Sequence, residues 1–161
     1  MRGAQAGSAS DLEALFRAHW PRAFRAAYLV THDAAAAEDI AQEAFLTAIR
    51  RLDRFDRRRP FGPWLHRIAV NRAIDWTRSR RLRAETPLED RISGPARGSD
   101  AAPSNDVMAA LARLSPEHRA VIVLRYLLEY TPGEIADALD LPRGTVNSRL
   151  RRGLDELGGA L

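Results

Sequence analysis

The 161-residue sequence contains no cysteine and no lysine, so its positive charge comes entirely from 25 arginines. Without cysteine the chain can form neither disulfides nor thiolate metal sites, and it has no cysteine nucleophile. No apolar run approaches the roughly 18–20 residues of a membrane-spanning helix, and residues 1–10 lack the apolar stretch of a signal peptide. We therefore expect a soluble, cytoplasmic protein with one ordinary domain or two small ones.

Signs of catalysis are also missing. The histidines at positions 19, 32, 66 and 118 are scattered, and neither metal-ligand nor triad spacing is present. There is no glycine-rich phosphate loop either. The sequence predicts a protein that is not an enzyme, with no catalytic residue, no metal site and no cofactor.

The arginines are segregated along the chain. Residues 57–83 hold nine arginines against one acid, and residues 143–161 hold four against two, whereas the rest is mildly acidic. Segregated charge of this kind indicates two separate surfaces that face a polyanion.

A break in composition divides the chain. Residues 84–104 contain three prolines, two glycines, three serines and few large apolar residues, which predicts a flexible linker. Helical apolar spacing dominates on both sides of it. The expected fold is therefore all-α, with two small helical domains at residues 10–83 and 105–158.

Capping signals place the helices of the first domain. Ser10 with Glu13 predicts a capping box, Pro21 is expected to kink or split the helix that follows, and Asp33 caps a helix running to about Leu52. One polar face of this last helix carries Asp39, Gln42, Glu43 and Leu46. Such a face is normally only solvated, but an apolar residue within a polar rim also resembles the centre of a protein interface.

A basic and aromatic region ends the first domain. A loop places Phe55 and Phe61 around Arg57–Arg59, and a helix from Trp64 to about Arg83 follows. This helix is expected to turn Leu65, Ala69, Ala73 and Trp76 inward and to expose Arg67, Asn71, Ile74 and Arg78. Interleaved arginines and aromatics suit single-stranded nucleic acid, on which rings stack, although a solvated arginine face remains the alternative.

The second domain contains a helix-turn-helix pattern. Ser115-Pro116 starts one helix, the Thr131–Glu134 capping box starts the next, and Pro142 opens a final helix that ends at Gly158-Gly159. Val146, Leu150, Leu154 and Leu157 are expected to face inward. The outward sector holds Gly144, Asn147, Ser148, Arg151, Arg152 and Asp155, as a major-groove recognition helix requires, with Arg149 on the flank near a phosphate. The alternative is a solvated helix.

These motifs resemble those of a known family. Residues 37–55, beginning Ala37-Glu38-Asp39-Ile40, resemble region 2.2 of bacterial RNA polymerase sigma factors. Residues 61–83, with Trp64-Leu65-His66-Arg67, are similar to regions 2.3 and 2.4, and residues 114–157, with Gly144-Thr145-Val146-Asn147, are similar to region 4. Short chains with only these two domains correspond to the extracytoplasmic-function (ECF, group IV) sigma factors.

The resemblance implies roles and partners. The region 2.2 face (Asp39, Gln42, Glu43, Leu46) would dock on the β′ clamp helices of core RNA polymerase, and region 4 on the β flap. The −10 promoter element would meet Phe55, Phe61, Arg67, Asn71, Asp75 and Arg78. The −35 element would meet Arg143, Thr145, Asn147, Ser148, Arg149, Arg151 and Arg152. An anti-sigma factor is an implied partner; the rival hypothesis is a two-domain helix-turn-helix regulator that works without polymerase.

Overall fold

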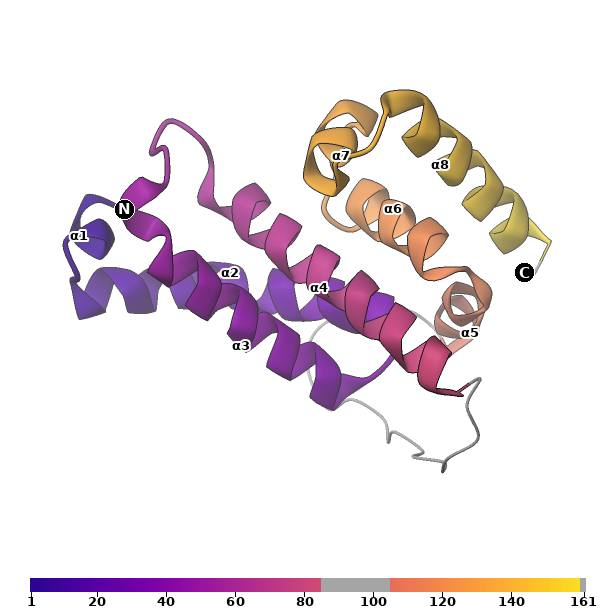
Figure 1. The fold of residues 1–161 in the computed structure, drawn as a ribbon, viewed down its shortest axis with the longest axis horizontal. Coiled ribbons are helices and arrows are strands. Elements are labelled where there is room, and N and C mark those ends of the chain that lie inside the picture. Colours follow the sequence, from indigo (N-terminus) through magenta and orange to yellow (C-terminus); the bar gives the residue numbers. More distant parts are fainter. Residues whose placement is uncertain (85–104, 160–161) are drawn as a thin grey trace.

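The computed structural model describes residues 1–84 and 105–159, and every regular element in these ranges is a helix (Figure 1). The all-α fold class is confirmed. The first unit, residues 1–84, contains α1 (Arg2–Gln5), α2 (Ala9–Thr31), α3 (Ala34–Arg50), the 3-10 turn η1 (Leu52–Arg54) and α4 (Phe61–Ala84). The second unit, residues 105–159, contains α5 (Asn105–Arg113), α6 (Pro116–Tyr126), α7 (Pro132–Leu139) and α8 (Arg143–Gly158). Apart from Ala84, the expected linker lies outside the described residues.

Helix α2 differs from its prediction at two points. Its N-cap is Ser8, whose hydroxyl accepts the Asp11 amide, so the expected capping box at Ser10 is wrong. Pro21 lies inside one uninterrupted helix, not at a break. An interior proline costs about 3 kcal/mol or more, and α2 remains whole because it packs on both sides of Pro21. Trp20 joins an aromatic cluster before it, and residues 26–30 enter the apolar core after it.

Helices α3 and α4 follow the prediction closely. Asp33 caps α3 by accepting the Ala36 amide at 3.0 Å, and α3 ends two residues before the expected Leu52. Helix α4 starts at Phe61, three residues before the predicted start, and buries Leu65, Ala69 and Ala73 completely.

The second unit keeps its predicted caps. Ser115 caps α6 ahead of Pro116, and Thr131 and Glu134 form the predicted capping box of α7. Val146 and Leu150 of α8 are buried as expected. Leu154 is 43% exposed, so its predicted inward position is wrong. The preceding residue makes the contact instead, because Gly153 is buried against the side chain of Ile122 in α6.

The two units share one apolar core. Val30, Val70 and Ile74 of the first unit pack in the same buried cluster as Val121 and Ile135 of the second. Figure 1 shows α4 running between α3 and the pair α6–α7, while α8 lies on the outer side of the second unit. A second cluster around Phe45, Phe55 and Phe61 belongs to the first unit alone.

One arginine, in the first turn of α6, joins the two units. Arg119 is buried, and its guanidinium donates to the carbonyl oxygens of Leu111, Ala112 and Leu114 and to that of Val30 in the last turn of α2. Helix C-termini carry partial negative charge, so these carbonyls stabilise a cation here without a carboxylate. Burial first, and then the charge of Arg81, lowers the pKa of Arg119 to about 10.

Candidate nucleic-acid interfaces

The outer face of α8 carries the first candidate interface. The turn before it is set by Asp140, which adopts a left-handed conformation, and by the Leu141 amide, which donates to the Ala136 carbonyl. Buried Val146 and Leu150 fix the rotation of α8 about its axis. Most of the predicted −35 residues are therefore exposed: Arg143, Asn147, Arg151 and Arg152.

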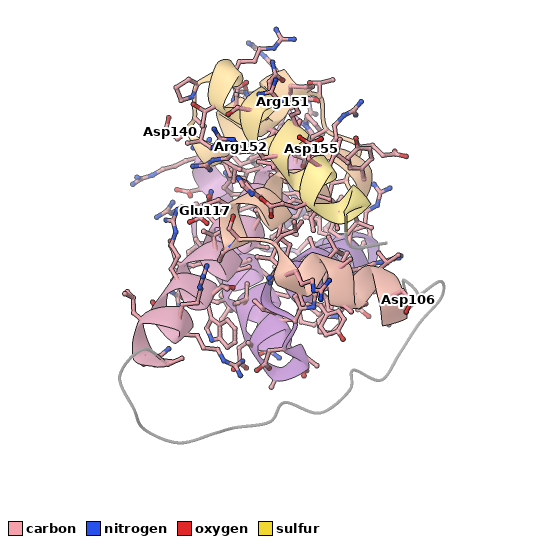
Figure 2. All side chains as sticks on the ribbon, turned by 90° about the vertical axis from the view of Figure 1, so that its right-hand side faces the viewer. Asp106, Glu117, Asp140, Arg151, Arg152 and Asp155 are labelled. Atoms are coloured by element: carbon pink, nitrogen blue, oxygen red, sulfur yellow. The ribbon has the colours of Figure 1, made fainter. Side chains whose placement is uncertain are left out.

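The remaining three predicted residues of α8 are half-buried. The Ser148 hydroxyl donates to the Thr145 carbonyl at 3.0 Å, so its proton is used within the helix. Burial raises the pKa of Glu117, but its hydrogen bonds from Arg78 and its own backbone, and then the charges of Arg78 and Arg149, hold it below its usual range. Figure 2 shows Arg151, Arg152 and Asp155 along α8, at the surface of the second unit. The exposed set can reach a duplex without rearrangement of the helix.

The second candidate interface, the predicted outer face of α4, is partly covered. Arg67 and Asp75 are exposed as expected. Asn71 is half-buried, and its side-chain amide donates to the Ala138 carbonyl of α7 at 3.1 Å. Arg78 donates to Glu117 of α6 at 2.7 Å. The prediction that this face is free is therefore wrong in this structure, because the second unit packs on it.

Ile74 gives the clearest correction on α4. The sequence pattern placed it on the exposed face, but it is 8% exposed and packs in the shared core. The spacing of apolar residues predicts which side of a helix is buried. A single isoleucine among arginines does not form such a pattern, so the burial of Ile74 was not predicted.

The two loop aromatics lie inside the first unit. Phe55 and Phe61 are 8% and 6% exposed, and the Phe55 ring centroid lies 4.6 Å from that of Trp64. Neither ring is presented for stacking on a base in this structure. The side chain of Gln5 donates to the carbonyls of Leu52 and Phe55, so α1 holds the start of this loop. Sequence reasoning missed Gln5 because a lone N-terminal glutamine carries no motif.

A groove of about 1060 Å³ lies between this loop and α7. The first unit contributes the arginines at positions 50, 51, 54, 59 and 67 to its lining, together with Asp53 and Asp56, and α7 contributes Glu134 and Asp137. The first unit therefore offers a concentration of positive charge that a phosphate backbone could use.

The polar face of α3 is exposed as predicted. Asp39, Gln42 and Glu43 are exposed, Glu43 forms a 2.9 Å ion pair with Arg72, and Leu46 is 52% exposed. Ile49, one turn beyond Leu46, is also exposed and enlarges the apolar centre of this face. Its i+3 spacing from Leu46 could have identified it from the sequence.

Sequence comparisons match both units to sigma-factor regions. The family described as Sigma-70 region 2 matches residues 15–83, and the family described as Sigma-70, region 4 matches residues 104–157. The ECF RNA polymerase sigma factor SigL of Mycobacterium tuberculosis is 38% identical over 97% of this chain and 96% of its own length. SigW of Bacillus subtilis, also an ECF sigma factor, is 38% identical over 75% of this chain and 73% of its own.

Solved structures give the same fold. The sigma factor RpoE of Bartonella quintana, in complex with the anti-sigma factor NepR, superposes with a TM-score of 0.77 at 21% identity, over 93% of this chain and 96% of that one. CnrH, in complex with the cytosolic domain of CnrY, superposes with a TM-score of 0.72 at 26% identity, over 98% and 92%. None of the helices within residues 1–84 and 105–159 combines the length and apolarity needed to cross a bilayer.

Proposed function

Because this chain belongs to the ECF RNA polymerase sigma factors, which bind core polymerase and direct initiation at specific promoters, we propose which of its surfaces perform each step. Region 2 is assigned to residues 10–83 and region 4 to residues 105–158. The observation that supports this most is that two basic faces occur in separate units: an exposed helix-turn-helix face on α8 and an arginine-rich face on α4.

The face of α8 is proposed to read the −35 element as duplex. Arg151 and Arg152 can form bidentate hydrogen bonds with guanine, each worth about 1–3 kcal/mol of base discrimination. Asn147 suits a base edge nearer the helix N-terminus, whereas Arg143 and Arg149 suit phosphates. Thr145 and Ser148 complete the set at the same end of α8.

The face of α4 is proposed to hold the separated −10 strand. Arg67 and Arg78 would contact its backbone, and Asn71 and Asp75 would contact bases. Phe55 and Phe61 were predicted to stack on bases, which would require the loop and the first residue of α4 to leave the aromatic cluster. Each stacked base contributes about 1–3 kcal/mol.

These contacts are too weak to open a promoter. Separating about ten base-pair steps costs on the order of 14 kcal/mol, so the chain must act with core polymerase, as a specificity subunit that is not itself an enzyme. We propose that the α3 face, with Asp39, Gln42, Glu43 and Leu46, docks on the β′ clamp helices and that the second unit docks on the β flap. An anti-sigma factor is proposed as a further partner. Action on polymerase would take place in the cytoplasm.

Reconstituted transcription tests the assignment. Core polymerase freed of sigma factor is combined with the full chain and a genomic DNA library, and the 5′ ends of the transcripts are sequenced. We expect discrete start sites that share −10 and −35 sequences and vanish when the chain is omitted. Tight duplex binding by the chain alone, with no start-site selection, would instead identify a regulator independent of polymerase.

A further inference from the structure

Helix α1 lies at one end of the first unit, beside the start of α2 (Figure 1). The turn between the two helices contains Gly7, whose left-handed φ of 83° suits glycine, and Ser8, which caps α2. The Ser8 amide donates to the Gly3 carbonyl at 2.8 Å, and a Cβ on Gly3 would overlap the Asp11 carboxylate of α2. Residues 1–7 are therefore folded back against the first unit.

The apolar side of α1 belongs to the aromatic cluster of that unit. Ala4 is buried in the cluster with Leu52, Phe55 and Phe61, and Met1 packs against it. Because Leu52 begins η1 and Phe55 follows it, these contacts place α1 against the turn that leads into the loop before α4. Burial of apolar surface thus fixes α1 beside this turn.

Gln5 makes the polar contact between α1 and the turn. Its side-chain Nε2 donates to the Leu52 carbonyl at 2.8 Å and to the Phe55 carbonyl at 3.1 Å. A side-chain amide carries two donor hydrogens, so one glutamine can supply both bonds. The Leu52 carbonyl also accepts the Phe55 amide at 3.2 Å. Gln5 therefore ties down both ends of a turn that lies 47 and 50 positions further along the chain.

The tethered turn leads into the basic part of the loop. Arg54 and the arginines at 57–59 are exposed, and Arg54 and Arg59 line the same groove as Arg67 of α4. Side chains from separate elements form one binding surface only when neighbouring contacts hold those elements in place. The position of the turn therefore decides whether the loop and α4 can contact one strand together.

We propose that α1 positions the loop for recognition of the −10 strand and that Gln5 is its positioning residue. This rests on the proposed function of the loop and α4. Gln5 itself does not touch the strand, because its half-buried amide is engaged by the two carbonyls. Without these bonds the loop shifts relative to α4. Its arginines still attract the strand by charge, but the bases are discriminated less well.

Two substitutions at Gln5 separate hydrogen bonding from packing. Gln5→Met keeps a side chain of similar length and volume but removes both donor hydrogens. Gln5→Lys restores donors, because an ammonium group has three of them. Since lysine also adds a positive charge, Ala6→Lys at the neighbouring exposed residue is the matched control. Far-ultraviolet circular dichroism checks that all three variants fold.

Hydrogen exchange, followed by mass spectrometry on the full chain, measures how firmly the loop is held. Hydrogen bonds within residues 51–59 protect the amides of Arg54, Phe55, Arg58 and Arg59. We expect peptides from this segment to exchange at least roughly threefold faster in Gln5→Met, and peptides from α7 and α8 to be unchanged. Gln5→Lys should exchange at the rate of Ala6→Lys. An unchanged rate in Gln5→Met would overturn the proposal.

Transcription by the chain with saturating core polymerase measures the effect on recognition. A promoter obtained from the genomic library is compared with one altered at −10 and one altered at −35. In Gln5→Met the yield ratio of the first promoter to the second should fall roughly threefold or more. The ratio for the −35 alteration should not change, because α8 is untouched. Gln5→Lys should match Ala6→Lys in both ratios.

The outcomes distinguish this proposal from the assignment of function. A chain that is merely destabilised loses yield on all three promoters alike, so equal losses in Gln5→Met would overturn the positioning role. Faster exchange with an unchanged −10 ratio would overturn it too, as would failure of Gln5→Lys to match Ala6→Lys. A wild type that does not distinguish the two −10 sequences contradicts instead the function assigned to the loop and α4.

Discussion

His66 of α4 and Tyr130, which precedes α7, share a buried hydrogen bond of 3.3 Å between the imidazole Nδ1 and the phenol oxygen. The bond joins the first unit to the second. Burial lowers the pKa of His66 to about 4, and the charges of His19 and Arg22 on α2 act in the same direction. His32, beside Arg119, also has its pKa lowered to about 4, again mainly by burial.

The folded chain, in which the two units pack together, should therefore lose stability in mild acid. Both histidines are neutral when folded, whereas unfolded histidines take up protons near pH 6.5. The free energy of unfolding should stay constant above that pH and fall between about 6.5 and 4, by up to about 1.4 kcal/mol per pH unit for each histidine. Urea denaturation at a series of pH values measures the slope.

A single substitution tests how much of this pH dependence of the free energy of unfolding comes from His66. His66→Asn places an amide where Nδ1 was and cannot be protonated, so it should make the decline between pH 6.5 and 4 shallower. His118→Asn is the matched control, at a histidine whose Nδ1 lies 3.0 Å from a carboxylate oxygen of Glu156 within the second unit. If both variants reduce the pH dependence of the free energy of unfolding equally, the effect does not come from His66.

Much of the fold was readable from local signals. The caps at Asp33, Ser115 and Thr131 are short-range hydrogen bonds, so sequence spacing alone located the helices they start. Pro21 misled because its local cost is outweighed by packing along the rest of α2, which no local rule records. Most of the exposed face of α8 was placed correctly because its apolar and basic residues lie largely on different sides, although Leu154 was assigned to the wrong side.

The covered face of α4 was not readable in this way. Ile74 packs in a cluster with residues of the second unit, and Asn71 donates to the carbonyl of Ala138, 67 positions away. The composition of the segment between the units predicted a flexible linker, which gave no sign that the units pack together. Burial of Phe55 and Phe61 was missed for a related reason. Aromatics among arginines suit stacking on bases and packing in a core equally well, and only the positions of Phe45 and Trp64 decide between them.

Arg152→Ala should weaken discrimination at the −35 element. Its guanidinium is exposed on α8, and loss of one bidentate base contact costs about 1–3 kcal/mol. Run-off transcription from a cognate promoter and from one with an altered −35 element should give more nearly equal yields. Arg113→Ala, an exposed arginine at the end of α5, should preserve the preference. An equal loss of affinity for core polymerase would refute the assignment of Arg152 to DNA.

Leu46→Ala should weaken binding to core polymerase without destabilising the chain. The side chain is half exposed, so its truncation leaves no cavity, whereas a leucine at an interface centre can contribute more than about 1 kcal/mol to binding. Titration of labelled chain with core polymerase measures the affinity, and urea denaturation measures the stability. Leu82→Ala, at a more exposed leucine near the end of α4, is the control. If both variants bind core polymerase with the same affinity, Leu46 and the α3 face do not form part of the polymerase interface.

Two glycines of α8 should respond differently to alanine. A Cβ on Gly153 would lie 3.2 Å from Cγ1 of Ile122, whereas one on Gly144 meets nothing within 4 Å. Alanine is favoured over glycine within a helix by up to about 1 kcal/mol. Gly144→Ala should therefore raise the melting temperature, and Gly153→Ala should gain less or lose stability, because α8 must move away from α6. Gly153→Ala with Ile122→Val should recover part of the difference, since the shorter side chain makes room. If Gly153→Ala stabilises the chain as much as Gly144→Ala does, α8 does not depend on this close contact for its position.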